Sequence, residues 1–368
     1  MIADFLDKIN SLKKNNLYRE LVDSDAAGSV MVKRGAKKYI SFCSNDYFGL
    51  SQNAAVKAAA RKALDKFGVG AGASRYVSGN NGLYRKVESC IARLKNCDDA
   101  IVFSSGYQAA IGVVPALVGE GDLVLADKLI HSSLLDGVKL AGAKLVRFRH
   151  NDVAHCEHLL KDNIKKYQKI LIITETVFSM DGDRGEVAKL LELARKNNCL
   201  FLTDAAHQVD FMKVKNYPLH LQMGTLSKAV GAFGGYVAGD KILIDYLRNF
   251  AKSAIYTTAL PPCILAAAEQ SLKIISRKNL AAKVLENAKY FCQLMNLPQS
   301  ESAIVIIKIG DNKKVLEIAQ RVKESGFLIS AIRPPTVEPK GARLRITFSA
   351  LHNKKQILAL SQALKKYV

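Results

Sequence analysis

Two neighbouring stretches decide the fold of this chain: Cys199-Leu-Phe-Leu-Thr-Asp-Ala-Ala-His207 and Leu221-Gln-Met-Gly-Thr-Leu-Ser-Lys228. Each contains a short apolar run that leads into a charged side chain, Asp204 in the first stretch and Lys228 in the second. Short runs of this kind, bounded by polar residues, are typical of buried strands in a parallel sheet. Because ligands of such sheets bind beyond the carboxyl ends of the strands, both charged groups are candidates for a functional site.

Further apolar runs lie on both sides of these stretches, at residues 101–103, 123–126, 144–148, 170–174 and 235–238. Helical patterns stand between several of them, for example at residues 153–166 and 186–197. This alternation of strands and helices predicts an α/β domain built around a largely parallel sheet. In this interpretation the uncharged stretch 100–119 is a strand, a turn and a helix, since polar residues, glycines and Pro115 interrupt it, and it is not a membrane span.

The pattern changes after about residue 265, where a smaller α+β domain is expected. Its predicted elements are a helical stretch at 264–296, a strand at 303–309, a helix at 312–325, a strand at 343–348 and a helix at 353–366. The chain opens with apolar residues at helical spacing, which predicts an amphipathic N-terminal helix. We therefore expect an N-terminal arm at residues 1–45, a large domain at 46–265 and a small domain at 266–368.

The composition indicates a globular protein with an unusual charge. The 368 residues include 54 Lys and Arg against 33 Asp and Glu, a net charge of +21, and 49% are hydrophobic, which excludes a disordered chain. The lysines are spread along the whole chain, and no helix-turn-helix, zinc module or basic stretch with interleaved aromatics is visible, so nucleic-acid binding is not expected. Two interpretations of the charge stay open: a lysine-rich surface, or attraction of a phosphate-bearing substrate.

The cysteines and the N-terminal residues indicate the compartment. Seven cysteines form no C-x-x-C pair, which favours a reducing environment, and no Cys/His cluster has the spacing of a metal site. The first eight residues carry two aspartates where a signal peptide needs basic and then apolar residues. We expect a cytoplasmic protein that does not bind membranes.

Two more polar clusters follow predicted strands, in addition to Asp204 and Lys228. Ser104-Ser-Gly-Tyr-Gln108 opens a helix, whose free N–H groups suit a phosphate, and His131 comes just after another strand. Lys228 has no charged neighbour between residues 216 and 239, so its amine is a candidate nucleophile. A phosphate cradle, an aromatic group, a carboxylate and an amine together suit pyridoxal 5'-phosphate (PLP), with Lys228 forming the Schiff base and Asp204 facing the ring nitrogen.

In order along the chain, the motifs of this sequence resemble those of the α-oxoamine synthases, a family of fold-type I PLP enzymes. The matching stretches are Ser44–Leu50, Gly68–Arg75, Ser78–Gly79, Phe103–Gly106, His131–Leu134, Arg147–Phe148, His150–Asp152, Thr174–Glu175, Val177–Asp183, Asp204–His207, Thr225, Lys228, Ala331–Val337 and Ala342–Ile346. The resemblance covers nearly the whole length. It implies an aspartate aminotransferase-like fold, with a large domain of mostly parallel sheet and a small C-terminal α+β domain.

The resemblance also implies a role for individual residues toward PLP. Lys228 would hold the cofactor and move the Cα proton, Asp204 would pair with the ring nitrogen, and His131 would stack on the ring. The remaining implied PLP contacts are His207 and Ser179 at the ring oxygen, and Gly106, Tyr107, Thr225 and Thr258 at the phosphate. Thr258 would come from the neighbouring subunit, because the family is dimeric with its active site at the subunit interface.

Four more positions would contact the substrates. Asn45 matches an asparagine near the reacting carbonyl, and Arg19 and Thr336 would contact substrate. Arg345 would bind the amino-acid carboxylate as a bidentate fork. Arg343 projects to the same face of its predicted strand, so the choice between the two arginines stays open.

The family members are acyltransferases that condense an amino acid with an acyl thioester and release CO2. Ala331-Ile-Arg-Pro-Pro-Thr336 favours the branch of biotin biosynthesis, which joins L-alanine to pimeloyl-CoA or a pimeloyl-acyl-carrier protein. The alternatives are 5-aminolevulinate synthase, glycine C-acetyltransferase and, more remotely, an inactive scaffold protein with a PLP-enzyme fold. The sequence departs from the family at Ala205, Tyr84 and Ser227, and in a shortened segment between His207 and Lys228.

Overall fold

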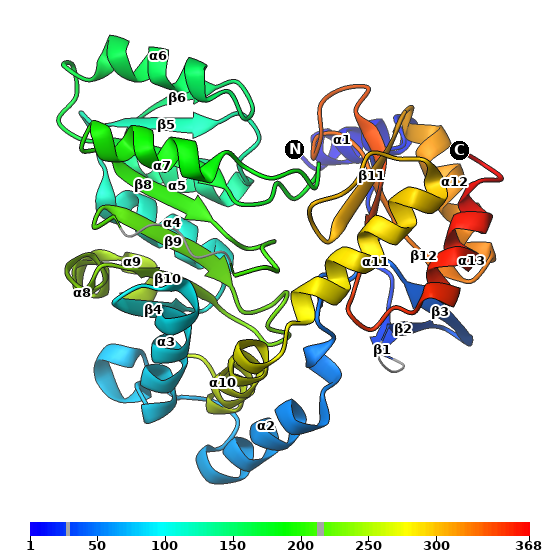
Figure 1. Cartoon of the computed structure of the whole chain (residues 1–368), viewed down its shortest axis with the longest axis horizontal. Helices are drawn as coiled ribbons and strands as arrows, with labels where there is room; N and C mark the ends of the chain where they lie inside the picture. Colours follow the sequence, from blue (N-terminus) through cyan, green and yellow to red (C-terminus); the bar gives the residue numbers. More distant parts are fainter. Residues whose placement is uncertain (27–29, 212–216) are drawn as a thin grey trace. The chain divides into compact units, whose positions relative to one another are not determined.

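The computed structural model describes residues 1–26, 30–211 and 217–368, and its contacts divide the chain into two compact units. The large unit comprises Leu50–Phe178 and Asp183–Leu280, and the small unit comprises Met1–Gly49, Ser179–Gly182 and Ala281–Val368 (Figure 1). No helix in the described ranges is long and apolar enough to cross a membrane. Residues 100–119 form the expected strand, turn and helix, in which the strand is β4 (Asp99–Phe103) and the helix is α4 (Gly106–Leu117).

The large unit is built on a sheet that has seven strands in the described residues, in the order β4-β10-β9-β8-β7-β5-β6. The strands are β4, β5 (Leu123–Asp127), β6 (Lys144–Phe148), β7 (Ile170–Glu175), β8 (Leu200–Asp204), β9 (His220–Thr225) and β10 (Gly235–Gly239). Strands β9, β8, β7, β5 and β6 pair in parallel, whereas β10 is antiparallel to both of its neighbours. The prediction of a largely parallel sheet is therefore confirmed.

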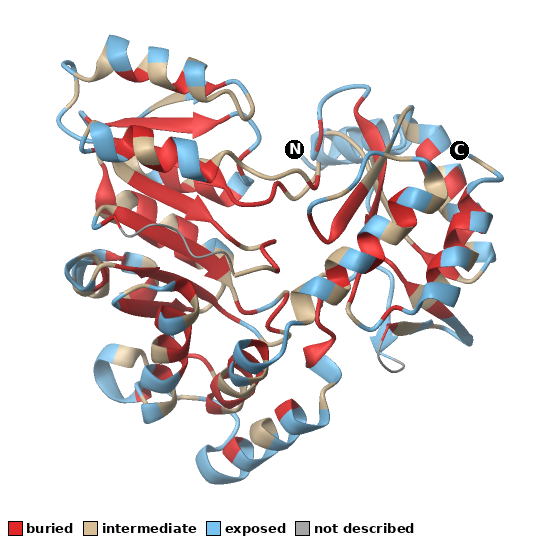
Figure 2. Ribbon diagram, viewed as in Figure 1, coloured by how far each residue is buried: buried red, intermediate tan, exposed pale blue. Residues whose placement is uncertain are grey.

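Helices cover both faces of this sheet. The helices of the large unit are α2 (Ala54–Phe67), α3 (Gly82–Lys95), α4, α5 (Ser132–Ala141), α6 (Val153–Asn163), α7 (Val187–Lys196), α8 (Lys241–Phe250), α9 (Lys252–Ile255) and α10 (Pro262–Arg277). Of these, α10 packs against α2 and α3. Short helical turns lie at Leu50–Gln52 and Arg75–Gly79. Val124 and Ala126 pack in the core cluster of α4 and α5, and Leu123 and Leu125 pack in the cluster of α6 and α7. Alternate residues of one strand thus enter two cores, which explains why the central strands are buried along most of their length (Figure 2).

The small unit contains a three-stranded antiparallel sheet, in the order β11-β14-β13, within its described residues. Its elements are α1 (Ile2–Lys14), β1 (Asp25–Ala26), β2 (Met31–Arg34), β3 (Lys37–Ser41), α11 (Leu280–Met295), β11 (Ile304–Gly310), α12 (Asn312–Glu324), β12 (Phe327–Leu328), β13 (Ser330–Ile332), β14 (Ala342–Thr347) and α13 (Lys354–Leu364). Phe42, Phe291 and Phe348 are fully buried at the centre of its core. The expected helical stretch at 264–296 is two helices, α10 and α11, with Lys278 and Asn279 between them.

Parallel pairing brings the carboxyl ends of β5, β7, β8 and β9 to one edge of the large sheet. The last residues of these strands are Asp127, Glu175, Asp204 and Thr225. Four polar residues that are far apart in the sequence therefore lie along one sheet edge, where ligands of α/β sheets bind.

Candidate active site

Lys228 and His207 form the centre of a polar cluster at this edge of the large unit. Lys228 follows β9, and His207 lies three residues beyond the end of β8. Lys228 Nζ lies 2.7 Å from His207 Nε2. His207 is buried and Lys228 is half-buried, so the amine is close to an imidazole and partly shielded from water. An amine in this position can act as a nucleophile and exchange a proton with its neighbour.

Two buried carboxylates, Glu175 and Asp204, lie opposite each other at the ends of β7 and β8, and we call them the carboxylate pair. Burial raises the pKa of Glu175 well above its usual range, and the negative charge of Asp204 raises it further. Burial also raises the pKa of Asp204, but the Lys228 ammonium and the Ala206 N–H, which donates to Oδ1 at 2.8 Å, favour its anion. Because adjacent carboxylates cannot both ionise easily, Asp204 is the member equipped to carry the charge.

His131 precedes α5 and connects this helix to the carboxylate pair. Its backbone N–H donates to Glu175 Oε1 at 2.6 Å, and its Nδ1 accepts from the Ser133 N–H at 3.3 Å as the helix N-cap. Desolvation lowers the pKa of the His131 imidazole, and the charge of Asp204 acts against that shift. The ring is therefore biased toward its neutral form, which can lie flat against an aromatic ligand.

The N-terminus of α4 forms a backbone cradle beside Thr225. The first N–H groups of a helix have no partner within the helix, and Ser105 caps this one by accepting from Gln108 N at 3.1 Å. A Cβ atom on Gly106 would lie 3.4 Å from Thr225 Cβ, and one on Gly235 would lie 2.3 Å from the Ser105 carbonyl oxygen. Only glycine at position 235 allows this close approach of the backbone, whereas a Cβ atom on Gly106 would make an ordinary contact. A helix start of this kind suits a phosphate group.

These residues of the large unit fit PLP. Its aldehyde requires an amine, its ring nitrogen requires a carboxylate, and its phosphate requires N–H donors and the positive end of a helix dipole. The sequence-predicted residues that the structure places along this edge are Lys228, His207, Asp204, His131, Gly106, Tyr107 and Thr225. Thr258 also belongs to the large unit, where it is exposed and forms an isolated β-bridge with Ser74.

A second set of predicted residues lies in the small unit. Arg345 Nε donates to the Ser179 carbonyl oxygen at 2.6 Å, and its Nη atoms lie 3.3 and 3.4 Å from Asn45 Oδ1. Asn45 Oδ1 also accepts from the Tyr47 hydroxyl at 3.2 Å, and burial raises the pKa of Tyr47 to about 12. The structure thus joins Arg345, Asn45 and Ser179 although they are distant in sequence.

Arg343 differs from Arg345 in how fully its guanidinium is bonded. Nη1 lies 2.5 Å from Asp181 Oδ1, Nη2 lies 2.7 Å from Glu338 Oε1, and Nε donates to the Gly341 carbonyl oxygen at 2.8 Å. Arg343 is 1% exposed, so this set of bonds binds the Ser179–Gly182 segment to β14. Elsewhere in the small unit, Arg19 donates to Thr336 Oγ1 at 2.8 Å, which brings together both residues predicted to contact substrate.

The structure shows the contacts of two residues at which the sequence differs from the family pattern, Tyr84 and Ser227. Tyr84 is buried, its hydroxyl accepts from Leu260 N at 2.6 Å, and the Arg75 guanidinium lies 3.8 Å above its ring. Ser227 Oγ lies 2.7 Å from Thr225 Oγ1. The shortened segment between His207 and Lys228 includes residues 212–216, which lie outside the described ranges.

Glu175 and the buried residues behind Asp204 are not among the site residues predicted from the sequence. Glu175 ends an apolar run just as Asp204 does, so the same strand-end pattern could have revealed it. Lys95, at the end of α3, was not singled out, because a lysine near a helix C-terminus normally caps the helix in water. Its burial, with 1% of its surface exposed, is visible only in the folded chain.

A network of hydrogen bonds among Asp127, His150, Asn151 and Asp183, which we call the His150 network, lies at the same edge. His150 Nδ1 lies 2.9 Å from Asp127 Oδ1, and Nε2 lies 2.7 Å from Asp183 Oδ2. Asn151 Nδ2 donates to Asp183 Oδ2 at 3.0 Å. Burial alone would lower the pKa of His150, but the two carboxylates outweigh it and raise the pKa to about 10.

Replacing His150 with glutamine should change the pH dependence of stability. Because the pKa of His150 rises from 6.5 to about 10 on folding, its stabilisation is complete below pH 6.5 and disappears as pH rises through 10. At pH 6 we expect H150Q to lower the unfolding free energy by about 2–3 kcal/mol, measured by urea denaturation, and the loss should vanish near pH 10. The matched H158Q variant removes only an exposed pair with Asp162 at 3.4 Å and should change little. An equal loss at pH 6 and pH 10 would contradict the protonated network.

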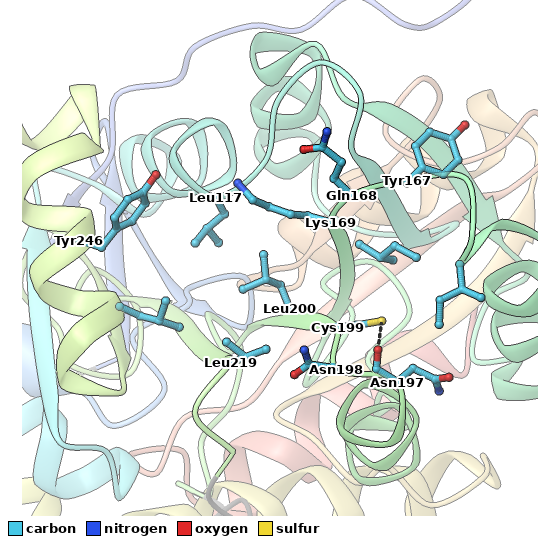
Figure 3. A pocket seen from close by; sticks show the side chains of 13 residues that line it. Leu117, Tyr167, Gln168, Lys169, Asn197, Asn198, Cys199, Leu200, Leu219 and Tyr246 are labelled. Carbon is cyan, nitrogen blue, oxygen red and sulfur yellow. Dashed lines mark hydrogen bonds between the residues drawn. The ribbon is translucent and has the colours of Figure 1, made fainter.

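A cavity lined by described residues lies away from this edge. It has a volume of about 440 Å³, and its lining includes Ile170 and Leu200 at the amino ends of β7 and β8. Figure 3 shows its side chains, with the Cys199 thiol hydrogen-bonded to the Asn197 carbonyl oxygen. Amino ends and carboxyl ends of parallel strands lie at opposite edges, so this cavity is separate from the Lys228 cluster. In the described ranges, no group of His, Cys, Asp and Glu side chains could hold a metal ion.

Comparison with known proteins supports the resemblance. The family model described as aminotransferase class I and II matches residues 37–364. The chain is 43% identical to an 8-amino-7-oxononanoate synthase of Methylobacterium nodulans, over 98% of this chain and 95% of the relative. An 8-amino-7-oxononanoate synthase of Maricaulis maris is 39% identical, over 98% and 94% of the two chains.

Solved structures show the same fold. A serine palmitoyltransferase from S. paucimobilis, solved with PLP and myriocin bound, superposes with a TM-score of 0.90 at 25% identity, covering 99% of this chain and 96% of the other. An 8-amino-7-oxononanoate synthase from Francisella tularensis superposes with a TM-score of 0.74 at 28% identity, covering 90% and 99%. Both the relatives in sequence and the neighbours in structure therefore agree with the fold-type I architecture.

Proposed function

Because the chain belongs to the class I and II aminotransferase family, we propose that it catalyses the PLP-dependent reaction of its 8-amino-7-oxononanoate synthase relatives in biotin biosynthesis. In that reaction, a bond forms between Cα of L-alanine and the carbonyl carbon of a pimeloyl thioester. The thiol leaves, and the alanine carboxyl group is released as CO2. The observation that carries the proposal is the cluster of Lys228, His207 and the carboxylate pair at one sheet edge.

In this proposal the residues of the large unit bind PLP and move protons. PLP, when bound, accepts the electron pair released at Cα of the amino acid. Lys228 would hold the cofactor through Nζ, and once freed by the substrate amine it would take up the Cα proton. Asp204 would keep a negative charge beside the ring nitrogen, and His207 would hydrogen-bond the ring oxygen. Gly106, Tyr107 and Thr225 would hold the phosphate by N–H and O–H donors.

We assign the amino-acid carboxylate to Arg345 in preference to Arg343. The Arg343 guanidinium is already bonded to two carboxylates and a carbonyl oxygen, whereas the contacts of Arg345 with Asn45 are long, at 3.3 and 3.4 Å. Although Nε donates to the Ser179 carbonyl oxygen at 2.6 Å, the two Nη atoms are only weakly bonded and can donate to an incoming carboxylate. Asn45, Arg19 and Thr336, in the same unit, would contact the substrates, and the role of Ser179 at the cofactor stays a prediction.

Replacing Arg345 with lysine should weaken binding of the amino acid. The charge remains, but the bidentate fork is lost, so we expect the KM for L-alanine to rise at least about tenfold while kcat changes less. Steady-state kinetics with varied alanine measures this. Arg343→Gln is the matched variant on the same strand, and it should instead lower the unfolding free energy by about 3 kcal/mol, since it leaves Asp181 without its cation. A normal alanine KM for R345K, or a raised KM only in R343Q, would reverse the assignment.

The thioester would be pimeloyl-CoA or a pimeloyl-acyl-carrier protein, both of which are anionic. A net charge of +21 would speed the encounter with either, and its effect would weaken with ionic strength. We do not assign a nucleic-acid partner, and we propose a cytoplasmic location because the seven cysteines are free thiols in the structure.

We further propose that the protein is a homodimer in which Thr258 of one subunit reaches the phosphate of the other. Several large apolar side chains of the large unit are exposed in the single chain, namely Val69, Val77, Phe233 and Tyr256 at 79%, 81%, 51% and 81%. Isolated exposed hydrophobic residues are ordinary, but Val77 lies within the Arg75–Gly79 turn and Tyr256 lies two residues before Thr258, which forms a β-bridge with Ser74. Exposed apolar side chains on these two neighbouring segments suit a subunit interface.

A comparison of amino acids and thioesters tests the proposed function. L-Alanine and glycine are each combined with pimeloyl, succinyl and acetyl thioesters, and kcat/KM is measured for each pair. The proposal expects alanine with the pimeloyl thioester to be the best pair. Glycine with succinyl-CoA would identify a 5-aminolevulinate synthase, and glycine with acetyl-CoA a glycine C-acetyltransferase. A purified protein that shows no absorption band of bound PLP, after incubation with PLP and removal of the excess, would favour the scaffold alternative.

A further inference from the structure

The ammonium group of Lys95 is buried behind the turn that follows β8 and carries Asp204, and it has no role in the proposed reaction. Lys95 is the last residue of α3 and is 1% exposed. Its Nζ donates to the neutral Gln208 side chain, at 2.6 Å from Oε1. Its backbone carbonyl oxygen accepts from Gln222 Nε2 at 3.1 Å, which fixes the end of α3 against β9. Burial of a charged group whose hydrogen-bond partner is neutral lowers the stability of the folded chain, which indicates that the Lys95 charge has a function.

Gln208 belongs to the turn that carries Asp204 and His207. The Gln208 N–H donates to the Ala205 carbonyl oxygen at 3.1 Å, and the Ala206 N–H donates to Asp204 Oδ1 at 2.8 Å. One small hollow of about 10 Å³ is lined by Lys95, Gln208, the two alanines and Thr225. A hollow of this size holds at most one water molecule, so no bound anion can neutralise the lysine.

The charged and titratable groups that face Lys95 come from the elements around it. They are Cys97 after α3, Asp204 at the end of β8, Asp210 in the following turn, His220 at the start of β9 and Tyr236 of β10, which lines the same hollow. Burial lowers the pKa of Lys95 to about 8, while Cys97, Asp210 and Asp204 act to raise it, so the amine is still mostly charged at neutral pH. Burial lowers the pKa of His220 to about 3, so this ring adds no charge.

We propose that Lys95 is a positioning residue for Asp204, whose carboxylate it keeps ionised from behind while Gln208 holds the turn in place. Lys228 cannot supply this charge throughout the reaction, because its nitrogen is committed to the cofactor or to the Cα proton. Lys95 is sealed from solvent and from substrate, so its charge stays constant while Lys228 changes state. The inference rests on the proposed use of PLP, because ionised Asp204 matters only if it faces a ring nitrogen.

The test is the protonation of the ring nitrogen, measured by the 15N chemical shift of 15N-labelled PLP bound to the whole protein. In the native protein the shift should be that of a protonated ring nitrogen. Lys95→Met, which keeps the volume and removes the charge, should move the shift toward the unprotonated value and lower kcat about tenfold or more, with a smaller change in the KM for alanine. Lys86→Met, on the exposed face of the same helix, is the matched control and should change neither.

Gln208→Glu separates charge from packing. It leaves Lys95 in place but neutralises its field, so it should shift the 15N signal in the same direction as Lys95→Met, and it carries the test if the lysine variant does not fold. A native 15N shift in both variants would overturn the inference and limit Lys95 to a structural role. A shift in Lys95→Met alone would also overturn it, because packing would then be the cause. Failure of the native protein to bind PLP would instead contradict the proposed function.

Discussion

Replacing Lys228 with alanine should abolish turnover and remove the visible absorption band of covalently held PLP. Lys228 is the amine that the structure places 2.7 Å from His207 and within the field of the carboxylate pair. In the proposed function this one side chain both holds the cofactor and moves the Cα proton. Losing a nucleophile that is also the proton carrier should lower kcat by at least about 10³-fold.

The measurements for K228A are an absorption spectrum with added PLP and an assay of CO2 release from L-alanine with pimeloyl-CoA. The phosphate cradle at Gly106 and Thr225 remains, so PLP should still bind without a covalent bond. Lys241→Ala, an exposed lysine whose partner is Asp245 at 3.4 Å, is the control for loss of one positive charge. A K228A protein that kept both the absorption band and product formation would show that another amine holds the cofactor.

The large unit could be predicted from local sequence because its pattern is local. Most strands of the parallel sheet coincide with short, largely apolar runs of the sequence, as at residues 170–174 and 199–203. The polar residues that end these runs were visible for the same reason, which is why Asp204 and Lys228 were found. Only the topology of the fold, however, places the ends of β7 and β8 side by side.

The residues that sequence patterns could not find depend on contacts between distant segments. Lys95 and Gln208 are 113 positions apart, and Arg345 and Asn45 are 300 positions apart. A lysine at the end of a helix looks exposed until the rest of the chain packs over it. Likewise, the alternation of side chains along a strand puts Arg343 and Arg345 on one face. Only the contacts with Asp181 and Glu338 in the folded chain show that the Arg343 guanidinium is already fully bonded.

The break between α10 and α11 shows a different limit. Apolar spacing continues through residues 264–296, so periodicity predicted one stretch of helix there. The structure ends α10 at Arg277 and begins α11 at Leu280, and the division between the two units falls at the start of α11. Periodicity reports which face of a helix is apolar, and it does not report that two successive helices pack into different cores.

Replacing Asp204 with asparagine should stop removal of the Cα proton while leaving PLP attached to Lys228. Asparagine has the same shape and can still accept the Ala206 N–H, but it cannot hold a charge beside the ring nitrogen. Without that charge the ring accepts electrons poorly, so we expect exchange of the alanine Cα hydrogen in D2O, followed by NMR, to slow on the order of 10³-fold. Glu175→Gln is the matched control, because Glu175 is equally buried and accepts the His131 N–H, which a glutamine oxygen can also do. If both variants slow exchange equally, the carboxylate pair acts as a unit and Asp204 has no separate role.

The stability of D204N without cofactor tests the same assignment independently of activity. Burial raises the pKa of Asp204 above 3.8 in the folded chain, so its contribution to stability is complete below pH 3.8 and is lost as pH rises through the folded pKa. At neutral pH the buried charge therefore destabilises the cofactor-free protein, and D204N should be at least as stable as the native chain in urea. PLP binding should raise the unfolding free energy of the native protein more than that of D204N. This difference would show that the Asp204 carboxylate interacts with the ring nitrogen of PLP, although it destabilises the cofactor-free protein. Equal gains would mean that the carboxylate does not face the cofactor.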